Sequence, residues 1–135
     1  MPFHQGRLID HVHLRVSDLE ASRRFSRAVL QALGRDLTSE GPEHCSSDEL
    51  WIDRTDGPAS RVHLAFQARD RESVHALHAA ALAHGGRDNG RPGERSCHAG
   101  SDAAFAFEPD GNDIEAMFHG PTERSAESVI AGPKR

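Results

Sequence analysis

The feature that most constrains the fold is an internal repeat, seen when the sequence is shifted by 52 positions along itself. The segment IDHVHLRVSDLEASRRFSRAVLQALG then lies over RVHLAFQARDRESVHALHAAALAHGG. Identical residues fall at matching places in the pattern, including His11 with His63 and Asp18 with Asp70. A repeat of this length predicts two copies of one supersecondary unit that pack against each other.

Each copy is predicted to begin with a strand that leads into a helix. Apolar and polar side chains alternate over residues 8–16 and 61–67, which is typical of half-buried strands. Ser17 with Glu20 forms a capping-box pattern for the first helix, and Asp70 is a good N-cap for the second. Glycines predict the helix ends, at Gly34 and at Gly85–Gly86.

Short strands separated by Gly, Pro and Asp follow each helix. The clearest are residues 49–53, 103–107 and 112–118, and Glu108-Pro109-Asp110-Gly111 predicts the turn between the last two. The order is therefore β-α-β-β-β, twice. We expect an α+β fold in one domain over residues 1–135, with module one at 7–54 and module two at 60–118. The remaining 119–135 form a polar tail that is either flexible or laid against a partner.

Composition argues against several classes of protein. No apolar run approaches the roughly 18 residues of a membrane span, and no signal-peptide pattern opens the sequence. The net charge is −5 and the basic residues are scattered, which is a poor pattern for binding nucleic acid. Cys45 and Cys97 form no CxxC motif. We therefore expect a cytoplasmic protein that binds neither nucleic acid nor a membrane.

Strand periodicity predicts a metal site. Val12 and Leu14 would face the helix, so His11 and His13 face the other side of the sheet, and His63 has the matching place in the second copy. Glu115 lies on that side of the last strand. Two imidazoles and one carboxylate suit a divalent ion such as Fe, Mn, Zn, Ni or Co. The alternative is that these are ordinary solvated residues, since the chain has ten His.

On these motifs the sequence resembles the vicinal oxygen chelate superfamily, which includes glyoxalase I, extradiol dioxygenases and bleomycin-resistance proteins. The resemblance rests on DHVHLRVSDLEASRRF, VHLAF and EPDGNDIEAMF, and it covers about residues 7–118. It implies a glyoxalase-like fold, in which two βαβββ modules form a curled mixed sheet with the helices on its outer face. It also implies metal ligands at His11, His63 and Glu115, and a homodimer whose site can draw ligands from two chains.

The resemblance implies a metal-dependent enzyme that acts on a small substrate with vicinal oxygens, the metal serving as a Lewis acid. The reaction stays open between lyase or isomerase chemistry and dioxygenase chemistry. Glyoxalase I-like enzymes use a fourth ligand, for which Glu49 and Asp53 are the candidates, and dioxygenases use a Tyr that this chain lacks. Glu115, His13 or His98 could act as the general base. The alternative function is a bleomycin-resistance-like protein that sequesters a drug or metabolite.

Overall fold

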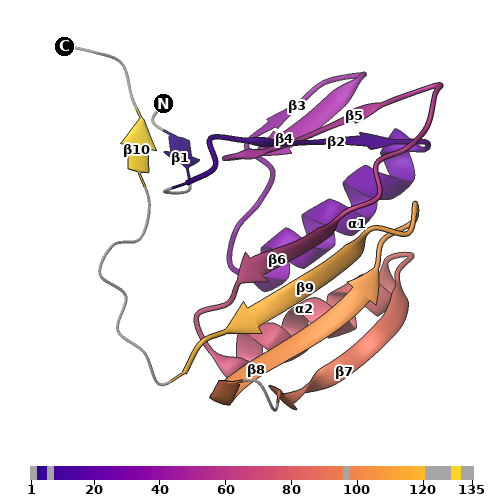
Figure 1. Cartoon of the computed structure of the whole chain (residues 1–135). Helices are drawn as coiled ribbons and strands as arrows, with labels where there is room; N and C mark the ends of the chain where they lie inside the picture. Colours follow the sequence, from indigo (N-terminus) through magenta and orange to yellow (C-terminus); the bar gives the residue numbers. More distant parts are fainter. Residues whose placement is uncertain (1–2, 6–7, 96–97, 121–128, 132–135) are drawn as a thin grey trace.

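The computed structural model describes residues 3–5, 8–95, 98–120 and 129–131 (Figure 1). Only the backbone is described at 3–5, 98–99 and 129–131. Module one contains β2 (Val12–Val16), α1 (Leu19–Ala32), β3 (Ser39–Glu40), β4 (His44–Ser47) and β5 (Leu50–Arg54). Module two contains β6 (His63–Gln67), α2 (Arg71–Ala83), β7 (Arg87–Arg95), β8 (His98–Phe107) and β9 (Asp113–Phe118). The predicted α+β fold with two βαβββ modules is thus confirmed.

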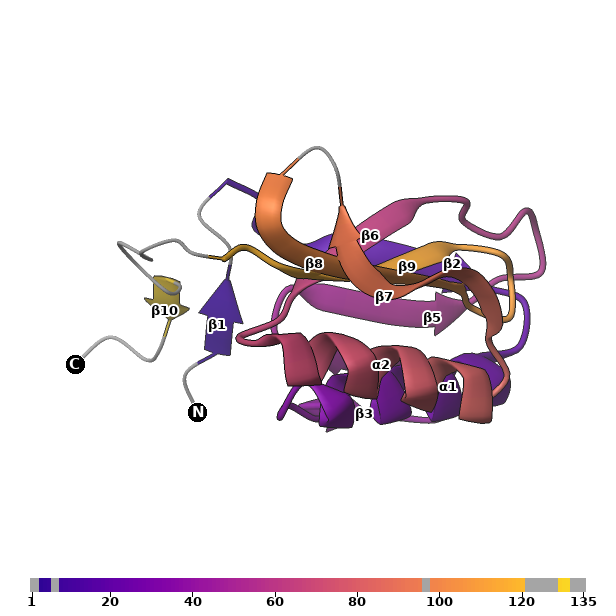
Figure 2. The same cartoon turned by 90° about the horizontal axis from the view of Figure 1, so that it is seen from below.

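Each module forms its own mixed four-stranded sheet, in the orders β2-β5-β4-β3 and β6-β9-β8-β7. In both, the first strand pairs in parallel with the last, and the other strands pair antiparallel. The helices lie on one side of each sheet, with α1 beneath the sheet of module one and α2 behind the sheet of module two (Figure 1), and Figure 2 shows the helices below the edge of the second sheet. We call the opposite side of each sheet its open face. Within the tail, β10 (Val129–Ala131) pairs with β1 (Phe3–Gln5), and residues 121–128 and 132–135 lie outside the described residues.

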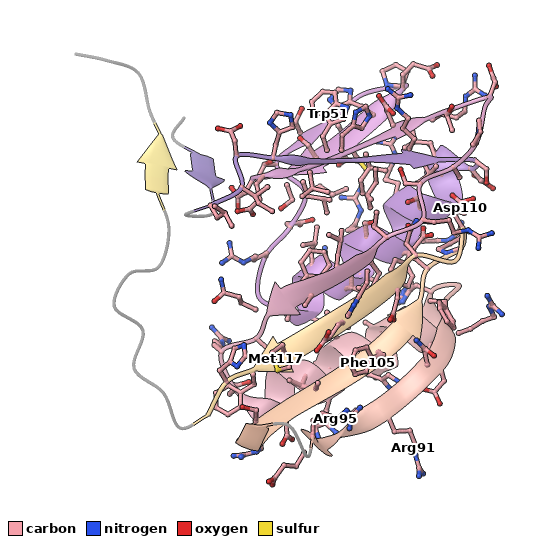
Figure 3. The ribbon with its side chains drawn as sticks, in the orientation of Figure 1. Trp51, Arg91, Arg95, Phe105, Asp110 and Met117 are labelled. Carbon is pink, nitrogen blue, oxygen red and sulfur yellow. The ribbon has the colours of Figure 1, made fainter. Side chains whose placement is uncertain are left out.

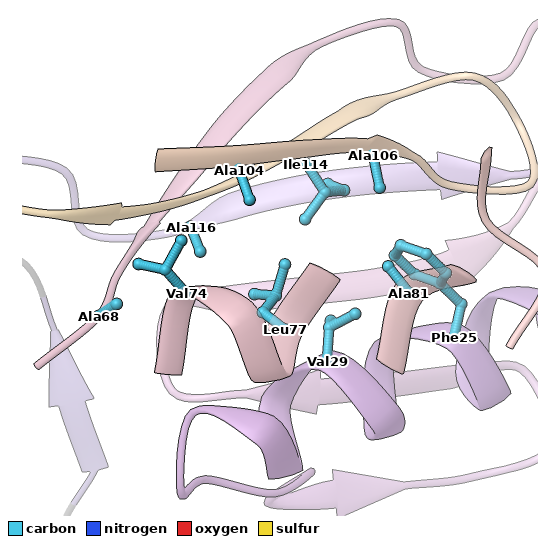
Figure 4. Close-up of a cluster of buried hydrophobic side chains, with 10 residues drawn as sticks. All are labelled: Phe25, Val29, Ala68, Val74, Leu77, Ala81, Ala104, Ala106, Ile114 and Ala116. Atoms are coloured by element: carbon cyan, nitrogen blue, oxygen red, sulfur yellow. The ribbon is translucent and has the colours of Figure 1, made fainter. Parts of the chain in front are cut away.

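The larger apolar core lies between the two helices and the sheet of module two (Figure 4). Leu77 and Val74 of α2 are fully buried there, and Phe25 and Val29 of α1 pack into the same cluster. One helix of module one therefore contributes to the core of module two, so the two modules share this core. A second cluster around Ile52 fills module one.

Apart from the first, the predicted strands begin within a few residues of their expected starts, and two differences at the start of module one have a clear physical reason. The first strand of module one begins at Val12 rather than at residue 8, and Leu8 is 94% exposed and pairs with no strand in the described part of the chain. The N-cap of α1 is Asp18, whose carboxylate accepts from the backbone N–H of Ala21, so the expected Ser17 capping box does not form. Asp70 caps α2 as predicted.

The predicted turn between β8 and β9 is confirmed. Its polar side chains stabilise the turn itself and connect it to the start of β6. Glu108 Oε1 accepts from the backbone N–H groups of Asp110 and Asn112 and from the Asn112 side chain. Burial raises the pKa of Glu108 despite these bonds. Asn112 in turn accepts from the Val62 N–H, which ties the turn to β6.

Asp110 connects this turn to module one. Its carboxylate accepts from the Ser17 backbone N–H at 2.9 Å and from the Ser17 hydroxyl at 2.5 Å. Ser17 is therefore occupied between the modules, which explains why it does not cap the helix. We expect Asp110→Ala to lower the free energy of unfolding by about 1–2 kcal/mol, measured by urea denaturation. Asp56→Ala, with a side chain 85% exposed, is the control and should change it by less than about 0.5 kcal/mol.

Candidate functional site

The open face of module two holds a close histidine–carboxylate pair. His63 Nε2 lies 2.7 Å from Glu115 Oε1, a hydrogen bond between the first residue of β6 and the middle of β9. The Glu115 side chain is only 6% exposed, whereas that of His63 is 54% exposed. The carboxylate is thus held at the floor of the face with the imidazole above it, where both can be reached from one side.

Strand pairing explains why these two side chains meet. β6 and β9 are parallel neighbours, and His63 lies opposite Asp113 while Ala65 lies opposite Glu115. Alternate residues share a face, so Asp113 and Glu115 both project beside His63. Asp113 is a site residue that the sequence reasoning missed, although its spacing of two from Glu115 is the signal that could have found it. Its Oδ2 lies 4.0 Å from His63 Nε2, and its buried Oδ1 has no hydrogen-bond partner among the described residues.

An aromatic ring bounds the pair on the next strand. Phe105 of β8 lies directly opposite Glu115 and its ring centroid is 5.8 Å from that of His63. The guanidinium of Arg95 also lies over this ring, 5.4 Å from its centroid. Figure 3 shows Arg95, Phe105 and Met117 gathered over module two.

The open face of module one carries a second pair. His13 Nε2 lies 2.8 Å from Asp53 Oδ1, between parallel strands β2 and β5. Burial alone would raise the pKa of Asp53. The hydrogen bonds from His13 and Trp51 outweigh this effect and hold the pKa of Asp53 below its ordinary value. Trp51 is stacked on His44, with ring centroids 4.4 Å apart and planes 3° from parallel. Hydrogen bonds and ring stacking thus join these four side chains into one polar and aromatic surface.

The helix starts show which residues of module one correspond to which residues of module two. The N-caps Asp18 and Asp70 are 52 residues apart, as the repeat predicts, so His11 is the counterpart of His63. The alternation on β2 is confirmed, because its residues alternate between exposed and buried from His13 onward. His11, however, precedes the strand, with its side chain 68% exposed and its Nδ1 2.9 Å from Asp10.

The counterpart of Glu115 in module one is not a carboxylate. In module one Val12 lies opposite Leu50, and in module two its counterpart Leu64 lies opposite Ile114. The residues that follow, Trp51 and Glu115, therefore correspond. An indole cannot bind a metal ion through its ring nitrogen, which is a donor only. Glu49 and Asp53 lie two residues to either side of this position, and Asp53 is paired with His13.

The chain brings His63 and Glu115 together but keeps His11 apart from them. β2 and β6 point in opposite directions in Figure 1, so His11 before β2 and His63 at the start of β6 lie at opposite ends of the two sheets. Among the described residues, no three His, Cys, Asp or Glu side chains are grouped closely enough to hold a metal ion. His98 begins β8, but its side chain lies outside the described residues.

Comparison with known proteins places this arrangement in a family. The model of the Glyoxalase/Bleomycin resistance protein/Dioxygenase superfamily matches residues 8–116. The chain belongs to this superfamily. Among curated proteins none matches the sequence.

No helix in the described residues is long and apolar enough to cross a membrane.

Several solved structures are similar to this chain. A glyoxalase/bleomycin resistance protein from Albidiferax ferrireducens T118 is 30% identical, with a TM-score of 0.70 over 83% of this chain and 99% of that one. A glyoxalase-related enzyme from Fulvimarina pelagi is 20% identical, with a TM-score of 0.68 over 95% of this chain and 99% of that one. The oxidase ChaP-H1 is 24% identical, with a TM-score of 0.57 over 82% of this chain and 94% of that one. At these lower identities, the last two structures show only that the fold is shared.

Proposed function

We propose that this protein is a metal-dependent enzyme that acts on a small substrate with vicinal oxygens. His63 and Glu115 would hold the ion, with His11 as the third ligand. The observation that carries the proposal is the 2.7 Å pair of His63 Nε2 and Glu115 Oε1 on an open face. Two His and one carboxylate leave coordination positions for substrate and accept Fe, Mn, Zn, Ni or Co.

The residues present fit a divalent cation. An imidazole nitrogen and a buried carboxylate oxygen already lie 2.7 Å apart around a shared proton that a cation would replace, and the orphaned, buried Asp113 Oδ1 lies on the same stretch of strand. A buried carboxylate oxygen without a donor is costly, and a cation bound nearby would offset that cost. The superfamily match supports the same assignment.

We propose that the third ligand comes from a second copy of the chain. Each open face lies on the side of its sheet away from the helices (Figure 1), so we infer that module one does not cover the His63–Glu115 pair of its own chain. A two-fold homodimer that sets module one of one chain over module two of its partner would bring His11 to the partner's pair, twice by symmetry. It would also enclose both sites.

When bound, the ion would act as a Lewis acid toward two neighbouring substrate oxygens. Phe105 would supply an apolar wall that limits water beside His63. Proton transfer at the substrate would fall to Glu115 Oε1, to His98, or to His13 through Nδ1. Asp53 accepts at His13 Nε2, which leaves Nδ1 as the atom that can take a proton.

The test is metal analysis of protein purified without a histidine tag. We expect Co²⁺ reconstitution to yield one ion for each chain, and the reconstituted protein to convert an α-hydroxyketone, a hemithioacetal or a catechol in a reaction that EDTA stops. Metal that stays substoichiometric after reconstitution would overturn the enzyme proposal. The protein would then be a candidate for the second function, sequestration of a drug or metabolite, which the bleomycin-resistance members of the family support.

A further inference from the structure

Arg95 is held in place beside the histidine–carboxylate pair. Its guanidinium donates from Nη1 to the Gly93 carbonyl at 3.2 Å and from Nη2 to the Arg91 carbonyl at 2.8 Å. It also lies over the Phe105 ring, within the distance of a favourable cation–π contact. Two backbone acceptors and one aromatic face fix a side chain that is ordinarily free to move.

Glycine makes this close packing possible. Gly90 lies opposite Phe105 in the sheet, at φ +154°, which is a conformation that favours glycine. A Cβ at this position would lie 3.0 Å from Phe105 Cδ1 and 3.4 Å from Arg95 Nη2. Irregular pairing between β7 and β8 on both sides of Gly90 bends the strand here. The glycine and the bent strand therefore allow Arg95 to pack over the Phe105 ring.

The charge of Arg95 has no acidic partner within the described part of the chain. A guanidinium has five N–H donors, and the two carbonyls use only two of them. The side chain lines an open hollow of about 580 Å³ together with Gly90, Arg91 and Pro92. Two arginines and a proline around an open hollow favour an anion.

We propose that Arg95, assisted by Arg91, is the subsite for an oxyanion group of the substrate, a carboxylate or a phosphate. The proposal rests on the proposed function and narrows its substrate class to small anions. The Phe105 ring links Arg95 to His63, since its centroid lies 5.4 Å from the guanidinium and 5.8 Å from the imidazole centroid. A substrate could therefore place its vicinal oxygens at His63 and Glu115 and its anionic end on the guanidinium, whose planar fork matches such groups.

The test uses metal-free protein, with inorganic phosphate and glycolate as separate probes at constant ionic strength. The signal followed is the NMR shift of the Arg95 Nε–H group and of the Phe105 ring protons. We expect saturable binding of at least one probe, and the probe that binds more tightly identifies the anion type. In Arg95→Gln the Phe105 shifts should show affinity lowered by at least about tenfold, the value expected for a lost charged hydrogen bond.

Arg24→Gln is the matched control, because Arg24 is exposed on α1 and its loss changes the net charge equally. It should leave probe affinity unchanged. Probe binding that is linear, or equal in Arg95→Gln and wild type, would overturn the subsite. Co²⁺ affinity of Arg95→Gln is measured in parallel and should equal that of wild type. Weaker probe binding with unchanged Co²⁺ affinity therefore indicates loss of the anion subsite alone, whereas absence of Co²⁺ binding in wild type indicates failure of the proposed metal site.

Discussion

Replacing Glu115 by Gln is expected to weaken Co²⁺ binding by at least about 100-fold, more than the loss of a residue that only supports a ligand. The amide keeps the size of the side chain and can still meet His63, but it removes the anionic oxygen that lies 2.7 Å from His63 Nε2. Affinity is measured from the visible absorption of Co²⁺ during titration of untagged protein. Thermal unfolding of the variant, followed in parallel, checks that it folds.

Glu72→Gln is the matched control, since Glu72 is exposed in the first turn of α2 and carries the same charge. Its Co²⁺ affinity should equal that of wild type. If a folded Glu115→Gln protein bound Co²⁺ as tightly as wild type, Glu115 would not be a ligand and the proposed site would be wrong.

Leu77→Ala is expected to lower the free energy of unfolding by about 2–5 kcal/mol, the usual cost of emptying a fully buried leucine site. Leu77 is 0% exposed in the core that α1 and α2 share with the sheet of module two (Figure 4). The measurement is urea denaturation followed by circular dichroism. Because the core joins both modules, we expect the transition to remain a single step.

Leu82→Ala makes the same chemical change five residues further along α2, where the side chain is 42% exposed. It should cost less than about 1 kcal/mol, because little apolar area leaves the core. Equal losses in the two variants, or two separate transitions in Leu77→Ala, would contradict a core shared between the modules.

The repeat and strand periodicity predicted much of the fold and part of the site. The shift of 52 residues correctly matched the N-caps and the first strands of the modules. Periodicity also predicted that His63 and Glu115 share a face, because alternation within one sheet depends only on local geometry. The residues RDNGRPGER, which form β7, gave no strand signal, since glycine and proline disfavour strands except at bulges.

What the sequence could not supply is the relation between the sheets. Placing His11 beside His63 requires the direction of β2 relative to β6, and local sequence patterns carry no information about that direction. Ser17 was expected to cap α1 because its pairing with Asp110, 93 residues away, cannot be read from local pattern. The counterpart of Glu115 in module one likewise became clear only from strand pairing, which identifies Trp51.

The most direct test of the shared metal site is complementation between two variants, His11→Ala and Glu115→Ala. The chains are co-expressed with two different tags, neither containing histidine, and the mixed dimer is isolated through both. His11 of one chain and the His63–Glu115 pair of the other then form one intact site, while the second site lacks both ligands. We predict one tightly bound Co²⁺ for each mixed dimer and none for either variant alone. A mixed dimer that binds no more Co²⁺ than the separate variants would contradict a site shared between chains.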